Sequence, residues 1–536
     1  MKTNNLIDVL VIGGGPAGST AASFAAKSKL SVILIEKEIF PRDHVGESLL
    51  PASMPILEEL GVLEKIESAG FLKKYGATMV WGNNNIPWSW QFSETNTKYT
   101  HAYQVTRSIF DGILLNRSKE LNVDVREGES AIEINLLEGT RGVTIRKSDG
   151  KKYFQPANII IDASGQSALI SRQTNTRKWD THFQNLAAYA YFKNGDKLAK
   201  PNENNIFIES FENGWIWSIP LKDNFTSVGV VTDAEISKNY LMSANSRDFL
   251  FHNIAKAPLT SQMLKSAELV STTKILKDWS YKTEHMAGNG WVLAGDSACF
   301  IDPLFSSGVH LAMMSGVLSS AYAVTYNKNK SFAKHCESIY EEIFDEEYSH
   351  FRDLALLFYS SNRSVDSYFW EARRLLEDES YYSSRSSFIR AISGQSTRGY
   401  ERVALEHGEL PPEFIRAVEK HSSESQTRTH ILKSFSSEIK YKIPTLSPDA
   451  KVTRTPVLAN GEFEWGIVLT YGNNKKGIPC SNLVASILNL VDANKNIEHI
   501  ARDIALKSTE SPENIISYVI QTLKILFVEG VVQELK

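Results

Sequence analysis

The sequence predicts an α/β fold that begins with a strand, a tight turn, a helix and a second strand. An apolar run from Asp8 to Ile12 leads into the turn Gly13-Gly14-Gly15-Pro16-Ala17-Gly18, and small residues continue a helical pattern to about Lys29. A second apolar strand, Ser31 to Ile35, ends at Glu36, 18 positions after the last glycine of the turn. This is the order of elements that a dinucleotide phosphate site requires.

Length and composition limit the architecture and the kind of partner. A chain of 536 residues is too long for one core of usual size, so we expect two or three domains. A net charge of −4, from 58 basic and 62 acidic residues, gives no electrostatic footprint for nucleic acid and favours a small-molecule or protein substrate. The three cysteines, Cys299, Cys336 and Cys480, are spaced too far apart to suggest a disulfide framework or a metal site.

The sequence also predicts a cytoplasmic location. No apolar run reaches the ~20 residues that span a bilayer, and the short polar N-terminus leaves no room for a cleavable signal. We therefore expect a soluble protein in a reducing compartment, with no integral membrane partner.

The chain divides into three predicted regions. Residues 1–350 form the α/β core, and an alternating pattern within it predicts an inserted β-sheet on the substrate side over about 184–280. Residues 351–430 are rich in aromatics and are predicted to be mostly helical. Residues 431–536 combine helix patterns over 482–491, 497–505 and 512–527 with a terminal apolar strand, which predicts a winged-helix-like domain.

Each glycine of the first motif has a task in a phosphate-binding turn. Gly13 makes the turn, Gly15 lets the backbone approach a pyrophosphate, and Gly18 lets helix and strand pack closely. Pro16 and Ala17 open the helix whose N-terminus faces the phosphates. Glu36 can accept the hydroxyls of an adenosine ribose and would repel an NADP-type phosphate. For this motif alone, the alternative is a tight strand-helix turn that binds no nucleotide.

Two further segments argue against that alternative. Gly295-Asp296-Ser297-Ala298, continued by Asp302 to Gly308, resembles the second dinucleotide segment of FAD monooxygenases of the para-hydroxybenzoate hydroxylase class. Asp162-Ala163-Ser164-Gly165 is similar to the strand-end motif that closes the nucleotide site in the same class. The resemblance implies a Rossmann-type FAD core of that class. It assigns cofactor binding, beyond the glycine motif and Glu36, to Arg42, Ser48, Arg107, Asp296, Pro303 and Gly308; for both arginines the alternative is a surface or salt-bridge role.

The heptad Gly214-Trp215-Ile216-Trp217-Ser218-Ile219-Pro220 points to a narrower family. It matches the Trp-x-Trp-x-Ile-Pro motif of flavin-dependent halogenases. Phe40 to Pro51, Lys74 to Ala77, Gln104 to Asp111 and Ala298 to His310 look like the branch of this family that acts on phenols and pyrroles. The resemblance covers roughly residues 5–400.

The resemblance to halogenases implies two reactive positions. In that family reduced FAD and oxygen form a flavin hydroperoxide, which a halide attacks to give hypohalous acid. Chloride or bromide is expected at the backbone N–H groups of Ser307 and Gly308, where a helix begins; in a hydroxylase the same turn contacts only flavin. A lysine then relays hypohalous acid to the substrate, and Lys74 holds the matching position, with a solvated loop lysine as the alternative. Lys73 is its control, because neighbours on a strand face opposite sides.

The resemblance also implies a wall between oxidant and substrate. Trp215 and Trp217 are two positions apart, so on a strand both indoles face one side. With Pro220 they would separate substrate from flavin and suppress direct hydroxylation. The alternative is a pair of core aromatics under a sheet.

The function implied is FADH2-dependent chlorination or bromination of a phenolic or pyrrole substrate in secondary metabolism, free or tethered to a carrier protein. The sequence carries no second glycine fingerprint for NADPH, so reduced FAD comes from a separate flavin reductase, or NADPH binds only transiently. Indole is disfavoured because no acidic residue follows Asp302 before Gly308. The alternatives are an FAD-dependent aromatic hydroxylase, a geranylgeranyl-reductase-like oxidoreductase and, outside enzymes, a catalytically silent flavoprotein or carrier-binding module.

Overall fold

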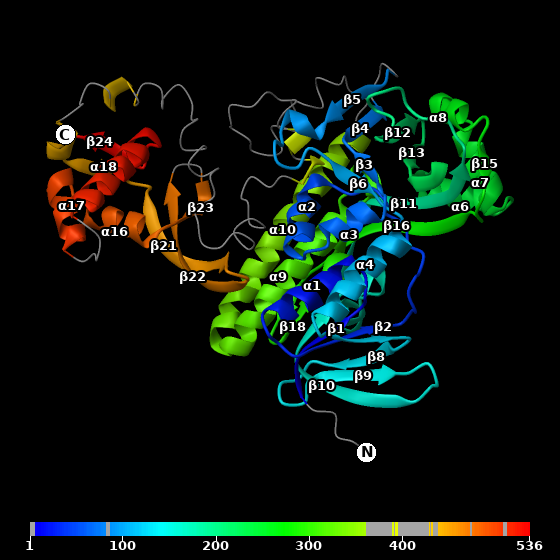
Figure 1. The fold of residues 1–536 in the computed structure, drawn as a ribbon, viewed down its shortest axis with the longest axis horizontal. Coiled ribbons are helices and arrows are strands. Elements are labelled where there is room, and N and C mark those ends of the chain that lie inside the picture. The colour runs from blue at the N-terminus through cyan, green and yellow to red at the C-terminus, as the bar shows by residue number, and fades with distance from the viewer. Residues whose placement is uncertain are drawn as a thin grey trace. The chain divides into compact units, whose positions relative to one another are not determined.

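The chain forms two compact units (Figure 1). The computed structural model describes residues 6–81, 86–360, 388–390, 392–394, 428, 430–432, 438–471, 474–506 and 512–536. The first unit comprises Met1–Asp378, Ser383–Leu405 and Asn460–Glu462, and the second comprises Glu379–Tyr382, Glu406–Ala459 and Phe463–Lys536.

An eight-stranded sheet forms the core of the first unit. Its order is β17-β18-β10-β1-β2-β7, with β8 and β9 paired beside β10. β1 pairs in parallel with β2 and β10, and β10 pairs in parallel with β18, so the carboxyl ends of these strands meet at one edge, where open α/β sheets bind ligands. The strands are β1 (Ile7–Ile12), β2 (Val32–Glu36), β7 (Asp124–Glu127), β8 (Ser130–Asn135), β9 (Gly142–Arg146), β10 (Lys152–Asp162), β17 (Ala287–Gly288) and β18 (Trp291–Leu293).

Four longer helices pack beside this sheet and against one another. α9 is buried along most of its 21 residues and packs on α1 so closely that a Cβ at Gly316 would lie 2.6 Å from the carbonyl oxygen of Ala17. The predicted strand, turn, helix and strand at the N-terminus are confirmed, as is a long helix from Gly308. The helices of this part are α1 (Pro16–Lys27), α2 (Met54–Glu59), α3 (Leu63–Ser68), α4 (Arg107–Glu120), α5 (Leu169–Thr174), α9 (Gly308–Lys328) and α10 (Lys330–Ser360).

A nine-stranded sheet forms the second layer of the first unit. Its order is β19-β16-β11-β14-β13-β12-β4-β5, with β15 beside β11. Its strands are β4 (Gly76–Val80), β5 (Trp88–Gln91), β11 (Arg177–Lys193), β12 (Ile206–Phe211), β13 (Gly214–Pro220), β14 (Phe225–Asp233), β15 (Glu268–Leu269), β16 (Lys274–Thr283) and β19 (Cys299–Phe300). The insertion predicted over about 184–280 is therefore only part of this sheet: β11 begins at Arg177, and β4 and β5 join from far upstream by pairing β4 with β12.

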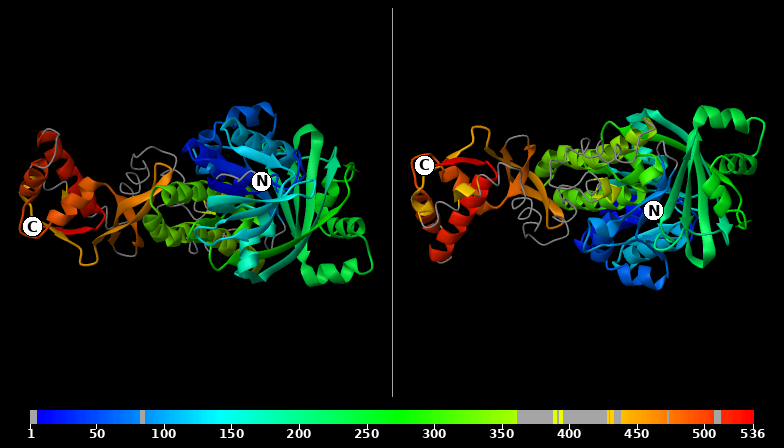
Figure 2. Two further views of the ribbon diagram at one scale, coloured as in Figure 1. Left: turned by 90° about the horizontal axis from the view of Figure 1, so that it is seen from below. Right: turned by 90° about the horizontal axis from the view of Figure 1, so that it is seen from above.

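The two faces of this sheet have different neighbours. Helices α6 (Ala234–Leu241), α7 (Ser246–Ile254) and α8 (Pro258–Met263) lie on the side away from the N-terminal helices (Figure 2). Ala188, Ile216 and Val230 point to that side and share a core with Phe249 and Leu250 of α7. Because side chains alternate along a strand, the odd-numbered residues of β13 point to the other face.

Two of the predicted boundaries differ from the structure. Helix α10 continues through residue 350, because no Gly or Pro interrupts the sequence from Lys330 to Ser360. The division into compact units lies between residues 378 and 406, after the predicted boundary at 350 and before the predicted boundary at 430. Most of the region 351–430, including the predicted aromatic helix beyond Ser360, lies outside the described residues.

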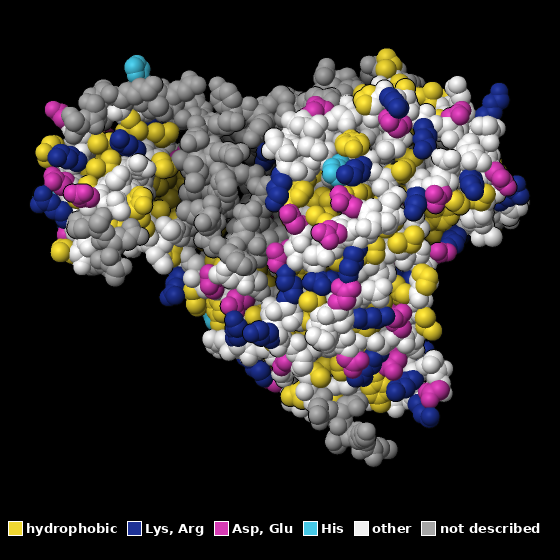
Figure 3. Space-filling model, in the orientation of Figure 1, with side chains coloured by type: hydrophobic (Ala, Val, Ile, Leu, Met, Phe, Trp, Pro, Cys, Tyr) yellow, Lys and Arg dark blue, Asp and Glu magenta, His cyan; other side chains and the backbone are white. Residues whose placement is uncertain are grey.

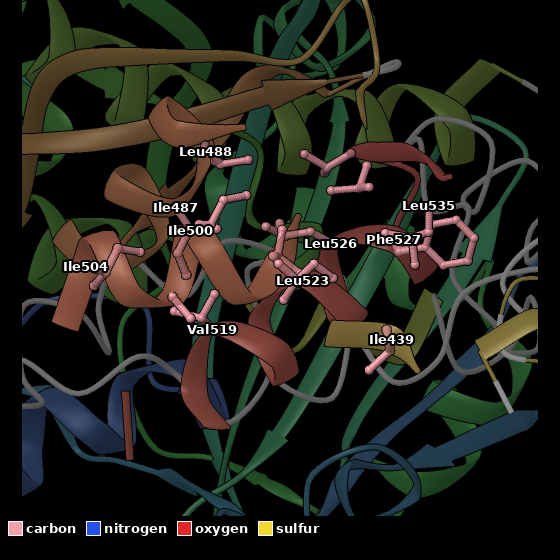
Figure 4. Packing of buried hydrophobic residues seen from close by; sticks show 14 of the residues in the cluster. Ile439, Ile487, Leu488, Ile500, Ile504, Val519, Leu523, Leu526, Phe527 and Leu535 are labelled. Atoms are coloured by element: carbon pink, nitrogen blue, oxygen red, sulfur yellow. The ribbon is translucent and has the colours of Figure 1, made fainter. Parts of the chain in front are cut away.

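The second unit has its own core. Helices α16 (Asn482–Leu490), α17 (Ile497–Ala505) and α18 (Pro512–Val528) match the three predicted helix patterns, and β24 (Val532–Leu535) pairs with β20 (Pro444–Leu446). A three-stranded sheet of β21 (Lys451–Ala459), β22 (Glu462–Tyr471) and β23 (Asn474–Cys480) completes the described elements. The helices share a core that includes Ile487, Leu488, Ile500, Val519 and Leu523, and in Figure 4 Phe527 lies beside Leu535 of β24.

The surface shows mixed charge. On the face drawn in Figure 3, Lys and Arg side chains are interspersed with Asp and Glu over the described residues, without a large patch of one sign. Within the described ranges, none of the helices has the length and apolar character needed to cross a bilayer.

Candidate functional site

The glycine turn at the end of β1 is fixed by close contacts. Gly13 has φ +105° and donates its N–H to the carbonyl of Ile35 at 2.8 Å. A Cβ at Gly18 would lie 1.9 Å from the carbonyl oxygen of Gly13, so any larger residue would push α1 away from β1. Gly14 donates its N–H to the buried carboxylate of Glu36 at 2.7 Å, which ties the turn to the end of β2.

The three sequence segments assigned to the nucleotide meet at this edge of the sheet. A Cβ at Gly13 would lie 2.3 Å from the carbonyl oxygen of Ala163, so the turn touches the segment after β10. The hydroxyl of Ser297 donates to the carbonyl of Asp162, and the N–H of Ala294 donates to the same oxygen at 2.8 Å. The structure thus brings together segments that are more than 100 residues apart.

Arg42 and Arg107 share one carboxylate. Arg107 is buried and forms two hydrogen bonds to Asp111, of 2.8 and 2.9 Å, and a further one to the carbonyl of Val45 at 2.5 Å. Arg42 lies 3.4 Å from Asp111 through Nη2, and the same nitrogen would lie 3.3 Å from a Cβ at Gly15. Arg107 therefore holds the loop that carries Arg42.

Two polar atoms beside this loop are buried and have no hydrogen-bond partner among the described residues: Nη1 of Arg42 and the hydroxyl of Ser48. A buried donor left unpaired is costly unless a ligand pairs with it. A guanidinium nitrogen next to the glycine turn suits a phosphate oxygen, and the hydroxyl suits the same ligand. The residues present therefore fit an FAD molecule along this edge.

Asp296 lies on the segment after β18. Burial raises the pKa of its carboxyl group to about 6, and the positive charge of Arg107 opposes that shift. Its backbone carbonyl accepts a hydrogen bond from Tyr281. Gly295 before it has φ +61° and packs near Ala17 of α1, which sets Asp296 at the edge where the three segments meet.

Lys74 and Lys73 face opposite sides of a short strand, as predicted. They lie in β3 (Leu72–Lys74), which pairs with β6 (Ala102–Gln104). Lys74 is 2% exposed; its Nζ donates to the carbonyl of Leu49 at 3.1 Å and lies 5.4 Å from the ring centre of Phe92. The Lys73 side chain is 44% exposed beside Glu67. Burial lowers the pKa of Lys74 to about 7, so a large fraction of this amine is neutral near that pH.

Glu47 is a second buried ionisable group in the same region. It accepts a hydrogen bond from Tyr191 of β11 at 2.8 Å, and burial raises its pKa. This contact joins the loop of Arg42 and Ser48 to the aromatic face of the nine-stranded sheet.

The two tryptophans of β13 lie side by side on that face. Their ring centres are 6.0 Å apart, and both indoles are buried. Trp215 continues the row to Trp81 at 6.4 Å, and Trp217 continues it to Tyr189 at 6.3 Å. Pro220 differs from the prediction: it ends β13 at an even-numbered position, so alternation places it on the α7 face rather than in this aromatic row.

A hydrogen-bond chain that the sequence did not predict connects this row to the loop after β19. The indole N–H of Trp215 donates to the hydroxyl of Tyr359 at the end of α10, and Tyr359 donates to the carboxylate of Asp302. Asp302 also accepts from Asn185 at 3.2 Å and from the N–H of Leu304 at 3.0 Å. Burial raises the pKa of Asp302 to about 6. No sequence spacing signals a contact between residues 144 positions apart.

Ser307 and Gly308 begin helix α9. Ser306 before them adopts a left-handed conformation with φ 58°, and Asp302 and Pro303 open the turn that leads into it. Within 4 Å of a Cβ at Gly308 the described atoms leave open space. The first N–H groups of a helix have no partner inside the helix and carry its positive dipole end, so this turn suits an anion.

Replacing Lys74 by Met should stabilise the fold most at neutral and lower pH. The folded-state pKa of Lys74 is lowered from 10.5 to about 7, so below about 7 the folded protein holds a desolvated charge, and this cost disappears as the pH rises toward 10.5. We expect the free energy of unfolding of Lys74→Met to exceed that of the wild type by on the order of 5 kcal/mol at about pH 6.5, and by little at about pH 10. Denaturant unfolding across this range measures the difference, and a difference independent of pH would contradict the expectation.

Comparison with known proteins agrees with this geometry. A family model described as FAD dependent oxidoreductase matches residues 8–179, which defines the class. A second model, described as Tryptophan halogenase, matches residues 95–407. The chain belongs to the tryptophan halogenase family, and it is an enzyme of the flavin-dependent halogenase type with FAD as its cofactor.

Two curated relatives show the range within the family. A tryptophan 2-halogenase of Chondromyces crocatus is 35% identical over 71% of this chain and 73% of its own length. A 1H-pyrrole-2-carbonyl-[peptidyl-carrier protein] chlorinase of Pseudomonas fluorescens is 32% identical over 69% of this chain and 87% of its own.

Two solved structures are similar as well. The myxobacterial chondrochloren halogenase CndH is 38% identical with a TM-score of 0.65 over 73% of this chain and 91% of its own. CmlS, a flavin-dependent halogenase, is 28% identical with a TM-score of 0.70 over 97% of this chain and 96% of its own, so the match extends into the second unit.

Proposed function

We propose that this enzyme chlorinates or brominates a phenolic or pyrrole substrate and that Lys74 carries the halogen to it. The observation that carries the proposal is the burial of Lys74 with its pKa lowered to about 7, because only a neutral amine has a free lone pair. The amine holds hypohalous acid by a hydrogen bond, or takes its halogen to form a haloamine with release of water. Transfer of that halogen to a ring carbon, with loss of the ring proton, restores the amine.

The residues proposed to bind FAD lie along the edge of the eight-stranded sheet where β1, β10 and β18 end. Bound FAD, with oxygen, supplies the oxidising equivalents for the halide. The turn from Gly13 to Gly18, with Pro16 and Ala17 opening α1, would hold the pyrophosphate together with Nη1 of Arg42. Glu36 would hold the ribose, and Asp296, Pro303 and Ser48 would line the rest. Arg107 would act through Asp111, by fixing Arg42.

The halide would bind at the first N–H groups of α9. Ser307 is buried. The N-terminus of a helix binds an anion through its backbone N–H groups, so no positively charged side chain is needed. Trp215 and Trp217 would stand between oxidant and substrate, since their face of the sheet contacts both the loop before Ser48, through Tyr191 and Glu47, and the loop of Asp302, through Tyr359.

The substrate class is supported by the state of Asp302. Its carboxylate is buried and already accepts hydrogen bonds from Tyr359, Asn185 and the Leu304 N–H, so it is poorly placed to help as a base. A phenol or pyrrole ring is electron-rich and needs less such help than other aromatics. Because one relative is named for a carrier-bound pyrrole, we propose both free and carrier-tethered forms as candidates, with a separate flavin reductase as the source of reduced FAD.

The test supplies the purified enzyme with FAD, a flavin reductase, oxygen and either chloride or bromide. Free phenols and pyrroles, and a pyrrole-2-carbonyl group loaded on a carrier protein, serve as probes. Mass spectrometry should find a halogenated product that depends on halide. Hydroxylated product or peroxide alone with every probe would contradict the proposal and return the hydroxylase alternative.

Replacing Tyr359 by Phe should disturb both ends of the chain from Trp215 to Asp302. It leaves the buried indole N–H without its acceptor, which costs about 1–3 kcal/mol of stability, and it removes a donor to Asp302. We expect roughly a tenfold lower yield of halogenated product per reduced flavin consumed. Tyr348→Phe, which removes a buried tyrosine hydroxyl from the same helix, is the control. Equal yields from Tyr359→Phe and the wild type would show that the chain has no role in turnover.

A further inference from the structure

The indole of Trp217 lies over the neighbouring strand β14, in space that is open only because Gly229 has no side chain. Trp217 of β13 pairs in register with Gly229 of β14. A Cβ at Gly229 would lie 2.0 Å from Cζ2 of the indole, 2.3 Å from Cη2 and 2.4 Å from Cε2. Carbon atoms in contact lie about 3.5–4.0 Å apart, so the ring rests directly on the backbone of β14.

The backbone at Gly229 gives no other reason for glycine. Among the described residues, the glycines with positive φ do not include Gly229, which lies inside a regular antiparallel ladder between β13 and β11. Glycine in a strand interior weakens the strand, so its presence there marks a close approach by another group. That group is the indole of Trp217.

Ser227 fixes the same ring from its polar edge. The indole N–H of Trp217 donates to the Ser227 hydroxyl at 3.3 Å, and both side chains are buried. Ser227 and Gly229 are two positions apart, so both lie on the face that carries Trp217. Tyr189 of β11, which pairs with Gly229, has its ring centre 6.3 Å from that of Trp217.

We infer that Gly229 and Ser227 are positioning residues that hold the indole of Trp217 flat against β14, and that this position determines how well the tryptophan wall separates oxidant from substrate. The second part rests on the proposed function. A methyl group at Gly229 must lift the ring off the sheet by an ångström or more, toward the face shared with Tyr189 and Trp215. The displaced indole would then project into the space beside the sheet instead of forming its wall.

The experiment compares Gly229→Ala with the wild type in two readouts. Protein labelled with 5-fluorotryptophan gives a 19F signal for each indole, and Trp217→Leu identifies the signal of Trp217. Turnover with FAD, a flavin reductase and bromide gives the ratio of halogenated product to released peroxide. We expect Gly229→Ala to shift the Trp217 signal, to keep FAD bound and to lower that ratio roughly tenfold.

Two further variants keep the test decisive if Gly229→Ala folds poorly. Ser227→Ala removes the acceptor without adding volume, and it should shift the Trp217 signal and lower the ratio by a smaller factor. Ser218→Ala is the matched control, because Ser218 is buried on β13, the strand of Trp217, but points to the opposite face. It should change neither readout.

A double-variant comparison separates this inference from a general packing effect. When Trp217 is already Leu, adding Gly229→Ala should leave the product ratio unchanged, because the ring that it displaces is gone. An equal fall in both backgrounds, or an unmoved Trp217 signal in Gly229→Ala, would overturn the inference. A wild type that halogenates no probe while Trp217 still responds to Gly229→Ala would instead overturn the proposed function and leave the positioning intact.

Discussion

Lys74→Ala is expected to lower the yield of halogenated product by at least about 100-fold while reduced flavin is still oxidised. The side chain is buried and its neutral form is accessible near pH 7, so its removal deletes the only group proposed to carry the halogen. Flavin binding should persist, because β3 pairs with β6 and lies outside the edge formed by β1, β10 and β18. Peroxide or hypohalous acid released to solution should rise as product falls.

Lys73→Ala is the matched control for this variant. Lys73 is the adjacent residue on the same strand, it points to the opposite side and it is partly exposed beside Glu67. Product analysis by mass spectrometry, with a peroxide assay on the same samples, should find wild-type behaviour. A similar loss in both variants would remove Lys74 from its proposed role.

Gly18→Ala is expected to abolish FAD binding and to lower the free energy of unfolding by about 1–3 kcal/mol or more. The added methyl group would lie 1.9 Å from the carbonyl oxygen of Gly13 and 3.3 Å from the side chain of Ala163. Relief of that overlap requires α1 to move away from β1, which opens the turn that should hold the pyrophosphate. FAD fluorescence titration and thermal unfolding measure the two effects.

Gly112→Ala provides the comparison for Gly18→Ala. Gly112 lies inside helix α4, and no described atom lies within 4 Å of a Cβ placed there. Alanine in a helix interior is favoured over glycine by about 1 kcal/mol, so this variant should be slightly more stable than the wild type and bind FAD normally. If Gly18→Ala bound FAD as tightly as Gly112→Ala, the glycine turn would have no part in the cofactor site.

Local patterns in the sequence were sufficient for the nucleotide-binding edge. The glycine turn, Glu36 and the segments at Asp162 and Asp296 each end a strand, and parallel strands bring their carboxyl ends together by geometry alone. The three helices of the second unit could also be predicted, because each has apolar residues at helical spacing along one face. Lys74 was distinguishable from Lys73 only through strand alternation combined with the family motif.

Local sequence patterns could not predict the contacts between strands of the sheet or between segments that are far apart in the chain. The position of the Trp217 indole depends on the register between β13 and β14, which places Gly229 under the ring. Tyr359 reaches Trp215 because α10 continues past the expected boundary at 350, and an aromatic in a helical stripe looks the same whether it packs or bonds. The inserted sheet was placed too narrowly because β4 and β5 join it from a segment near residue 80, and no local pattern reveals such pairing.

The aromatic row from Trp81 through Trp215 and Trp217 to Tyr189 is made of the same kind of chemistry as the proposed substrate. Indole and phenol rings are electron-rich, and hypohalous acid attacks them readily. Burial protects these rings, and the N–H groups of Trp81, Trp215 and Trp217 are all paired. Under the proposed chemistry, every halogen that misses Lys74 is available to modify the protein itself. The enzyme would then lose activity in proportion to the number of turnovers and not to elapsed time. Accurate transfer of halogen through Lys74 would therefore protect the enzyme as well as the yield of product.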